Sequence, residues 1–176
     1  MHSSSSRPMP TPPSSDVVHA CVIVGCTDTR YRSVGRGSPV VLLAADPATA
    51  AALLERLPRH LRAIAPATLP LGIVGADASD DFDRWLRNFL DALGVPRTSF
   101  ITDAVFAAAT LGFALLDPDR VNGVVFLTRA ADASSIPAVE TNGDDTALLV
   151  TPCTFDNGVL SQSVIDEIVG FLDGLS

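Results

Sequence analysis

The sequence predicts an α/β fold, in which a mostly parallel sheet has helices on both faces. Short apolar segments rich in β-branched residues alternate along the chain with longer segments of helical periodicity. Several of the short segments, such as VVLLAA at 40–45, are apolar throughout, which is typical of strands buried on both faces of a parallel sheet. Two strand-like segments precede this alternation, and a tight turn joins them.

Seven strands are expected, each at an apolar or β-branched run bounded by turn residues. Their ranges are 17–24, 27–33, 40–45, 61–66, 98–102, 121–128 and 146–151. We interpret the GRG sequence at 35–37 as a hairpin turn between the second and third strands.

Four helices are expected between or after these strands. The first begins at Pro47 with Asp46 as its N-cap, and the others span 79–94, 104–116 and 163–175. The segment 79–94 has the clearest pattern, because acidic residues occupy its first turn and Gly94 ends it. Its large apolar side chains fall on one face: Phe82, Trp85, Leu86, Phe89, Leu90 and Leu93.

Length and composition favour a single domain at 16–176. A chain of 176 residues that is 47% hydrophobic can bury a sizeable core, and no internal repeat or linker divides it. The opening sequence MHSSSSRPMPTPPSS is rich in Ser and Pro, so residues 1–15 are expected to be a disordered tail.

The charged residues exclude several functional classes. The formal net charge of -8 argues against partners that are nucleic acids or anionic membrane surfaces. All 12 basic residues are arginine, and the absence of lysine excludes Schiff-base chemistry, Ser-Lys dyads and Walker-type phosphate loops.

The cysteines and the apolar runs predict a cytoplasmic protein without a transmembrane segment. Three cysteines are too few for a disulfide framework, which favours a reducing compartment. The longest apolar run, 104–116, is too short to span a bilayer. His19, Cys21 and Cys26 lack the spacing of zinc ligands, so no metal or other cofactor is expected.

Three segments together resemble α/β-hydrolases of the esterase and epoxide hydrolase type. YRSVGRGSPVVLL at 31–43 is similar to their second strand, turn and third strand, and LRAIAPATLPLG at 61–72 to their fourth strand and the loop after it. The segment 80–127, with DPDRV at 117–121, resembles the helix, nucleophile strand, elbow helix and next strand. The resemblance covers roughly residues 28–130 and implies a reduced α/β-hydrolase-like fold.

The same resemblance places catalytic positions on residues without catalytic groups. The family's elbow sequence is G-x-S-x-G, and its serine position falls on Ala104. The flanking glycine positions fall on Thr102 and Phe106, and the oxyanion-hole segment after the third strand reads Ala44-Ala45. What is implied is a remnant pocket, without catalytic residues, formed by Ala44, Ala45, Asp103, Ala104 and Val105.

The histidines also depart from the family's pattern. A Ser-His-Asp triad needs an imidazole near the C-terminus, but His2, His19 and His60 all precede the elbow. Thr154 stands at the position that the resemblance assigns to histidine. An acid remains possible at 142–145 or at Asp156.

Asp103 is the one weak catalytic candidate. A shift of the alignment by one residue makes it the elbow nucleophile, as in dehalogenases and epoxide hydrolases of this fold. The alternative is that Asp103 precedes the nucleophile position or caps the next helix. The spacing to DPDRV fits Ala104, and no histidine follows to act as a base, so we favour the alternative.

These observations favour a catalytically degenerate protein that acts as a structural or interaction subunit of a larger assembly. No cap domain fits between the sixth and seventh strands, so the edge strand from Thr146 to Thr151 is expected to meet a protein partner or a second copy, together with the tail. Two alternatives stay open: a non-catalytic binder of an apolar small molecule, and a hydrolase that uses Asp103.

Overall fold

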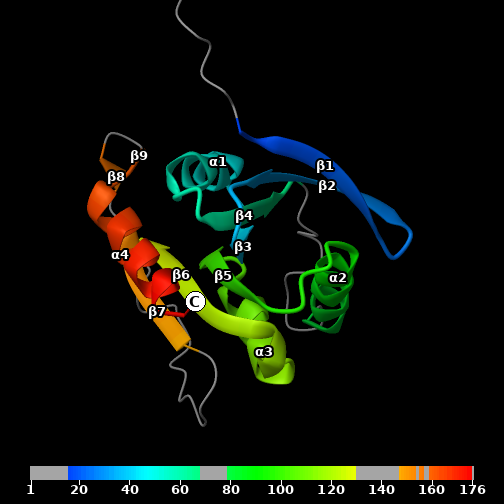
Figure 1. Cartoon of the computed structure of the whole chain (residues 1–176). Helices are drawn as coiled ribbons and strands as arrows, with labels where there is room; N and C mark the ends of the chain where they lie inside the picture. Colours follow the sequence, from blue (N-terminus) through cyan, green and yellow to red (C-terminus); the bar gives the residue numbers. More distant parts are fainter. Residues whose placement is uncertain (1–15, 68–78, 130–146, 154, 157–158, 176) are drawn as a thin grey trace, which may run out of the picture.

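Seven strands form one sheet in the spatial order β1-β2-β4-β3-β5-β6-β7 (Figure 1). The computed structural model describes residues 16–67, 79–129, 147–153, 155–156 and 159–175. The strands are β1 (Val18–Val24), β2 (Thr27–Val34), β3 (Ser38–Leu43), β4 (Leu61–Pro66), β5 (Thr98–Asp103), β6 (Val121–Arg129) and β7 (Ala147–Cys153). Each expected strand is present, with ends that differ by at most two residues.

The sheet is mostly parallel, as the sequence predicts. β2 pairs antiparallel with both β1 and β4, and the β4-β3, β3-β5, β5-β6 and β6-β7 pairs are parallel. A separate small sheet pairs β8 (Phe155–Asp156) with β9 (Val159–Leu160).

Helices cover both faces of the sheet (Figure 1). They are α1 (Pro47–Arg56), α2 (Ser79–Ala92), α3 (Ala107–Leu116) and α4 (Gln162–Asp173). Because side chains alternate along a strand, β3 contributes to two cores. Val40 and Leu42 pack with α1 and α4, whereas Val41 and Leu43 pack with α2 and α3. The predicted fold class is confirmed.

The ends of two helices have clear local causes. The Asp46 carboxylate accepts hydrogen bonds from the amide of Ala48 at 3.0 Å and that of Thr49 at 3.2 Å, which confirms the expected N-cap of α1. Residues 104–106 are not helical, although a helix was expected from residue 104, because Asp103 organises them as a turn.

The turn at 35–37 is not a hairpin turn, contrary to the expectation. β2 and β3 lie on opposite sides of β4, so the chain crosses the start of β4 between them. Gly35 has φ +82, and a Cβ there would collide with the carbonyl oxygen of Leu61. Gly37 has φ +139 and lies equally close to the carbonyl of His60. Both glycines are required because the two loops approach at backbone distance.

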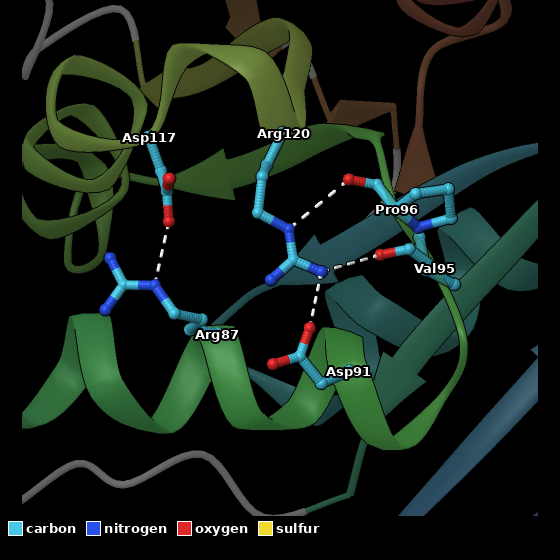
Figure 2. A network of polar contacts seen from close by, with 6 residues as sticks. All are labelled: Arg87, Asp91, Val95, Pro96, Asp117 and Arg120. Atoms are coloured by element: carbon cyan, nitrogen blue, oxygen red, sulfur yellow. Dashed lines mark hydrogen bonds and ion pairs between the residues drawn. The ribbon is translucent and has the colours of Figure 1, made fainter.

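A network of charged contacts joins α2 to the segment that leads into β6 (Figure 2). Arg120 donates from Nε to the carbonyl of Pro96 at 3.3 Å, and from Nη2 to that of Val95 at 3.1 Å. Its Nη2 also pairs with Asp91 of α2 at 2.7 Å. The Arg120 side chain is only 18% exposed, so one guanidinium fixes the loop between α2 and β5.

A second ion pair lies beside it. Arg87 of α2 donates from Nε to Asp117 at 2.8 Å, and Asp117 is the C-cap of α3 (Figure 2). The DPDR sequence at 117–120 therefore ends α3 and holds α2, α3 and β6 together.

Several expectations lie outside the described residues. These are the tail at 1–15, the loop between β4 and α2, and the segment between β6 and β7, which includes Thr146. Among the described residues, no helix has both the length and the apolar character needed to cross a bilayer.

Candidate functional site

The turn after β5 lies at the carboxyl end of the parallel strands, where open α/β sheets bind their ligands. β5 ends at Asp103, and α3 begins at Ala107. Phe106 is the N-cap of α3, with φ -99 and ψ 0, and it has no side-chain cap bond. The chain thus changes from strand to helix within three residues, as an elbow does.

The Asp103 carboxylate organises this turn by accepting three backbone hydrogen bonds. Its Oδ1 accepts from the amides of Val105 at 3.0 Å and Phe106 at 3.3 Å. Its Oδ2 accepts from the amide of Ala45 at 2.6 Å. The first two bonds close the turn, and the third joins it to the loop between β3 and α1.

Two of these bonds involve amides at the positions that the resemblance assigns to the oxyanion hole of an α/β-hydrolase. In that fold, one donor is the amide that follows the nucleophile and the other comes from the loop after the third strand. With Ala104 at the nucleophile position, the corresponding donors belong to Val105 and Ala45. Both of them donate to Asp103, the amide of Val105 to Oδ1 and that of Ala45 to Oδ2, so both are engaged within the chain.

The residues of the expected remnant pocket differ in burial. Ala45 and Asp103 are half-buried and in direct contact. Ala44 belongs to the buried core beneath α1 and α4. Ala104 and Val105 are exposed at the tip of the turn, and Val105 is 48% exposed. The described structure therefore joins three of the five residues by hydrogen bonds, because the amides of Ala45 and Val105 both donate to Asp103.

Phe106, at the second glycine position of the family's elbow, belongs to the core. Its side chain is fully buried, and its ring stacks on that of Phe82 from α2 with 5.9 Å between centroids. The phenyl ring of Phe106 therefore fills the space where α2 meets α3.

The two histidines of the described residues lie away from Asp103. His19 is on β1, an outer strand of the sheet, four positions from β5 in the strand order. His60 precedes β4, and its Nε2 pairs with Asp173 of α4 at 2.9 Å. The described ranges also contain no group of three His, Cys, Asp or Glu side chains that could hold a metal ion.

One further polar contact lies near the carboxyl end of the sheet. Thr151 of β7 is fully buried, and its hydroxyl donates to Glu167 of α4 at 2.6 Å. Thr154, the acidic candidates at 142–145 and the side chain of Asp156 lie outside what the structure describes.

Sequence reasoning identified Asp103 as a candidate cap but missed two contacts. Its bonds to Val105 and Phe106 follow the local pattern of an Asx turn, which the sequence around an aspartate can predict. Its bond to Ala45 spans 58 residues, and no local pattern indicates it. The Thr151–Glu167 bond depends likewise on how α4 packs against β7.

Comparisons with known proteins agree with this architecture. No family model matches the chain. It is 30% identical over 117 residues to a 2-hydroxy-6-oxo-2,4-heptadienoate hydrolase of Pseudomonas putida. This match covers 60% of this chain and 42% of that protein. The chain thus spans about two fifths of the length of this curated relative.

Solved hydrolase structures have the same fold. Epoxide hydrolase VrEH1 of Vigna radiata is similar over 64% of this chain and 40% of its own, with a TM-score of 0.54 and 19% identity. A serine hydrolase involved in carbazole degradation is similar over 64% of this chain and 48% of its own, with a TM-score of 0.53 and 24% identity. The described part of the chain has the α/β-hydrolase fold.

Proposed function

We propose that this chain, with its α/β-hydrolase fold, is a catalytically degenerate protein that acts as a structural or interaction subunit of a larger assembly. One observation carries the loss of catalysis: both carboxylate oxygens of Asp103 accept backbone hydrogen bonds at the elbow. Ala104, at the nucleophile position, has no group that attacks a substrate.

A hydrolase that uses Asp103 as its nucleophile has less support. Such an enzyme needs a carboxylate oxygen that reaches the substrate and a base that activates water to hydrolyse the ester intermediate. The Asp103 oxygens are engaged by three amides, and neither His19 nor His60 contacts Asp103.

A binder of apolar small molecules at the remnant pocket is also less well supported. The Phe106 ring is buried against Phe82 and is thereby part of the core. Leu71, the other residue expected to fill this pocket, lies outside the described residues.

The interaction role is supported by exposed apolar groups and by the outer strands of the sheet. β1 and β7 are the two outer strands of the described sheet, and outer strands offer unpaired backbone groups. At the end of α3, Leu115 is 67% exposed and Leu116 is 65% exposed. The proposed partner contact uses residues 146–151 and the tail at 1–15.

Native mass and activity together test this proposal. We expect the untagged full-length chain, purified gently from its own cells, to form a complex of fixed stoichiometry. We also expect no turnover of ester, epoxide or haloalkane substrates. A particle with the mass of one chain, or turnover that Asp103→Asn abolishes, would contradict the proposal.

A matched pair of variants tests whether β7, rather than the other outer strand β1, contacts the partner. Ala147→Lys on β7 and Ile23→Lys on β1 each place a lysine on an outer strand, at a residue that belongs to neither core cluster. We expect Ala147→Lys to reduce the native mass and Ile23→Lys to leave it unchanged. Circular dichroism melting of both variants checks that each one is folded, and an equal loss of mass would place the contact elsewhere.

A further inference from the structure

A cavity of about 450 Å³ lies at the end of the sheet opposite Asp103, where β3 and β4 begin. Two arginines line it, Arg36 before β3 and Arg59 before β4. Ser33, Val17 and Val18 also contribute to its lining. The volume suits a small-molecule ligand, and neither the elbow nor the proposed partner contact uses this cavity.

The backbone holds the two arginines next to each other. The amide of Arg36 donates to the carbonyl of Arg59 at 3.0 Å. This contact depends on the close approach of Gly35 to Leu61, where a side chain would collide with the carbonyl oxygen. The turn at 35–37 thereby places two guanidinium-bearing residues on one cavity.

The two guanidinium groups have different amounts of free hydrogen-bonding capacity. Arg59 Nη1 donates to the carbonyls of Leu54 at 3.1 Å and Leu57 at 3.3 Å, which anchors the side chain at the end of α1. Its other nitrogens make no hydrogen bond with a described residue. The Arg36 guanidinium makes no hydrogen bond or ion pair with any described residue.

The chemistry of the lining favours an anion with an apolar part. Two arginines and one aspartate, Asp16, line the cavity, so its charged residues sum to a positive charge in a chain whose net charge is -8. Guanidinium groups bind carboxylates and phosphates through paired N–H donors. Val17 and Val18 supply apolar surface, and Val18 is 59% exposed.

We propose that this cavity binds a small organic anion, whose carboxylate or phosphate lies between Arg36 and Arg59. The apolar part of the ligand packs on Val17 and Val18, and the Ser33 hydroxyl supplies a further hydrogen bond. This role is separate from the proposed loss of catalysis at the elbow.

Calorimetric titration of the full chain with three probes tests the proposal. The probes are phenyl phosphate, benzoate and the uncharged benzyl alcohol, all at constant ionic strength. We expect saturable binding of at least one of the two anions and none of the alcohol. The tighter anion identifies whether phosphate or carboxylate is the preferred group.

Two arginine variants provide the matched comparison. Arg36→Gln should weaken binding about tenfold or more, because it removes a charged hydrogen-bond donor from the cavity. Arg30→Gln makes the same change of charge at an exposed position of β2 outside the cavity, and should leave the affinity unchanged. Equal losses in the two variants would show a general charge effect and overturn the proposal.

The chain before Asp16 is the competing occupant of the cavity. A variant without residues 1–15 should bind the probes with the same affinity as the full chain. Binding only after this deletion would mean that the tail fills the cavity, and it would overturn the proposal. So would the failure of both anions to saturate either protein.

Discussion

The two ends of the parallel strands differ in how their charged side chains are satisfied. At the carboxyl end, the Asp103 carboxylate accepts hydrogen bonds from three backbone amides. At the amino end, the Arg36 guanidinium has no partner among the described residues, and Arg36 lines an open cavity. In most α/β sheets the ligand site lies at the carboxyl end.

The Asp103 carboxylate therefore stabilises the fold, whereas the Arg36 guanidinium is available to bind a ligand. A carboxylate that accepts internal amide bonds stabilises its turn, and its removal leaves amides without an acceptor. A guanidinium without an internal partner contributes little to stability, and its removal changes ligand affinity. The same type of experiment, substitution followed by unfolding and binding measurements, therefore gives opposite results at the two ends.

The largest effect is expected at Phe106. Replacing its fully buried ring with alanine leaves a cavity beside Phe82, so Phe106→Ala should lower the free energy of unfolding by about 3–5 kcal/mol. Val105→Ala, at the neighbouring exposed position, should change it by less than about 0.5 kcal/mol. Denaturant titration measures both, and similar values would show that the elbow is not part of the core.

Asp103 is expected to give the next largest effect. Asp103→Ala removes the acceptor of three amides and should cost about 2–3 kcal/mol in urea unfolding. Asp103→Asn keeps one acceptor oxygen, so about 1 kcal/mol is expected. An Asp103→Ala variant as stable as the original chain would remove the structural role and strengthen the case for catalysis.

Arg120 and Arg87 allow a comparison within the network of charged contacts that joins α2 to the segment leading into β6. Arg120→Ala removes contacts to Val95, Pro96 and Asp91 and should cost about 2 kcal/mol. Arg87→Ala breaks a more exposed pair and should cost about 0.5 kcal/mol. The Arg87 effect should shrink in 1 M salt, while the Arg120 effect largely persists. Equal salt sensitivity would contradict this ranking.

The smallest effects on the free energy of unfolding are expected for the two arginines at the amino end of the parallel strands. Arg59→Gln loses the hydrogen bonds to Leu54 and Leu57 and should cost about 1 kcal/mol of stability. Arg36→Gln should leave the unfolding free energy within about 0.5 kcal/mol of the original chain. Thermal melting without ligand tests this pair. A large loss at Arg36 would mean that its guanidinium holds the fold.

The fold was predictable because its signals are local. The acidic first turn and apolar face of α2, and the Asp46-Pro47 start of α1, each lie within one helix. Apolar runs located the strands to within two residues. The turn at 35–37 was misassigned because its geometry depends on β4, which pairs with both β2 and β3.

The candidate site was predictable only in part. The sequence placed Ala104 and Phe106 where a serine and a glycine are needed, and it named Asp103 as a cap. The occupation of the Ala45 amide by Asp103 depends on the parallel pairing of β3 with β5. The Arg36–Arg59 contact likewise joins two loops that are separate in the sequence. Neither contact can be predicted from a local pattern, because each joins segments that only the long-range pairing of the strands brings together.

The position of β1 and β2 has a consequence for the order of folding. These two strands form the one pair of the described sheet that a two-residue turn closes, whereas each parallel pair needs a crossover connection. Hairpins form in microseconds, and crossover pairings follow later. During synthesis β2 leaves the ribosome before α1 and before β4, the strand with which it pairs. Through that interval the hairpin presents two open edges, at which pairing with another chain competes with the pairing of β2 and β4.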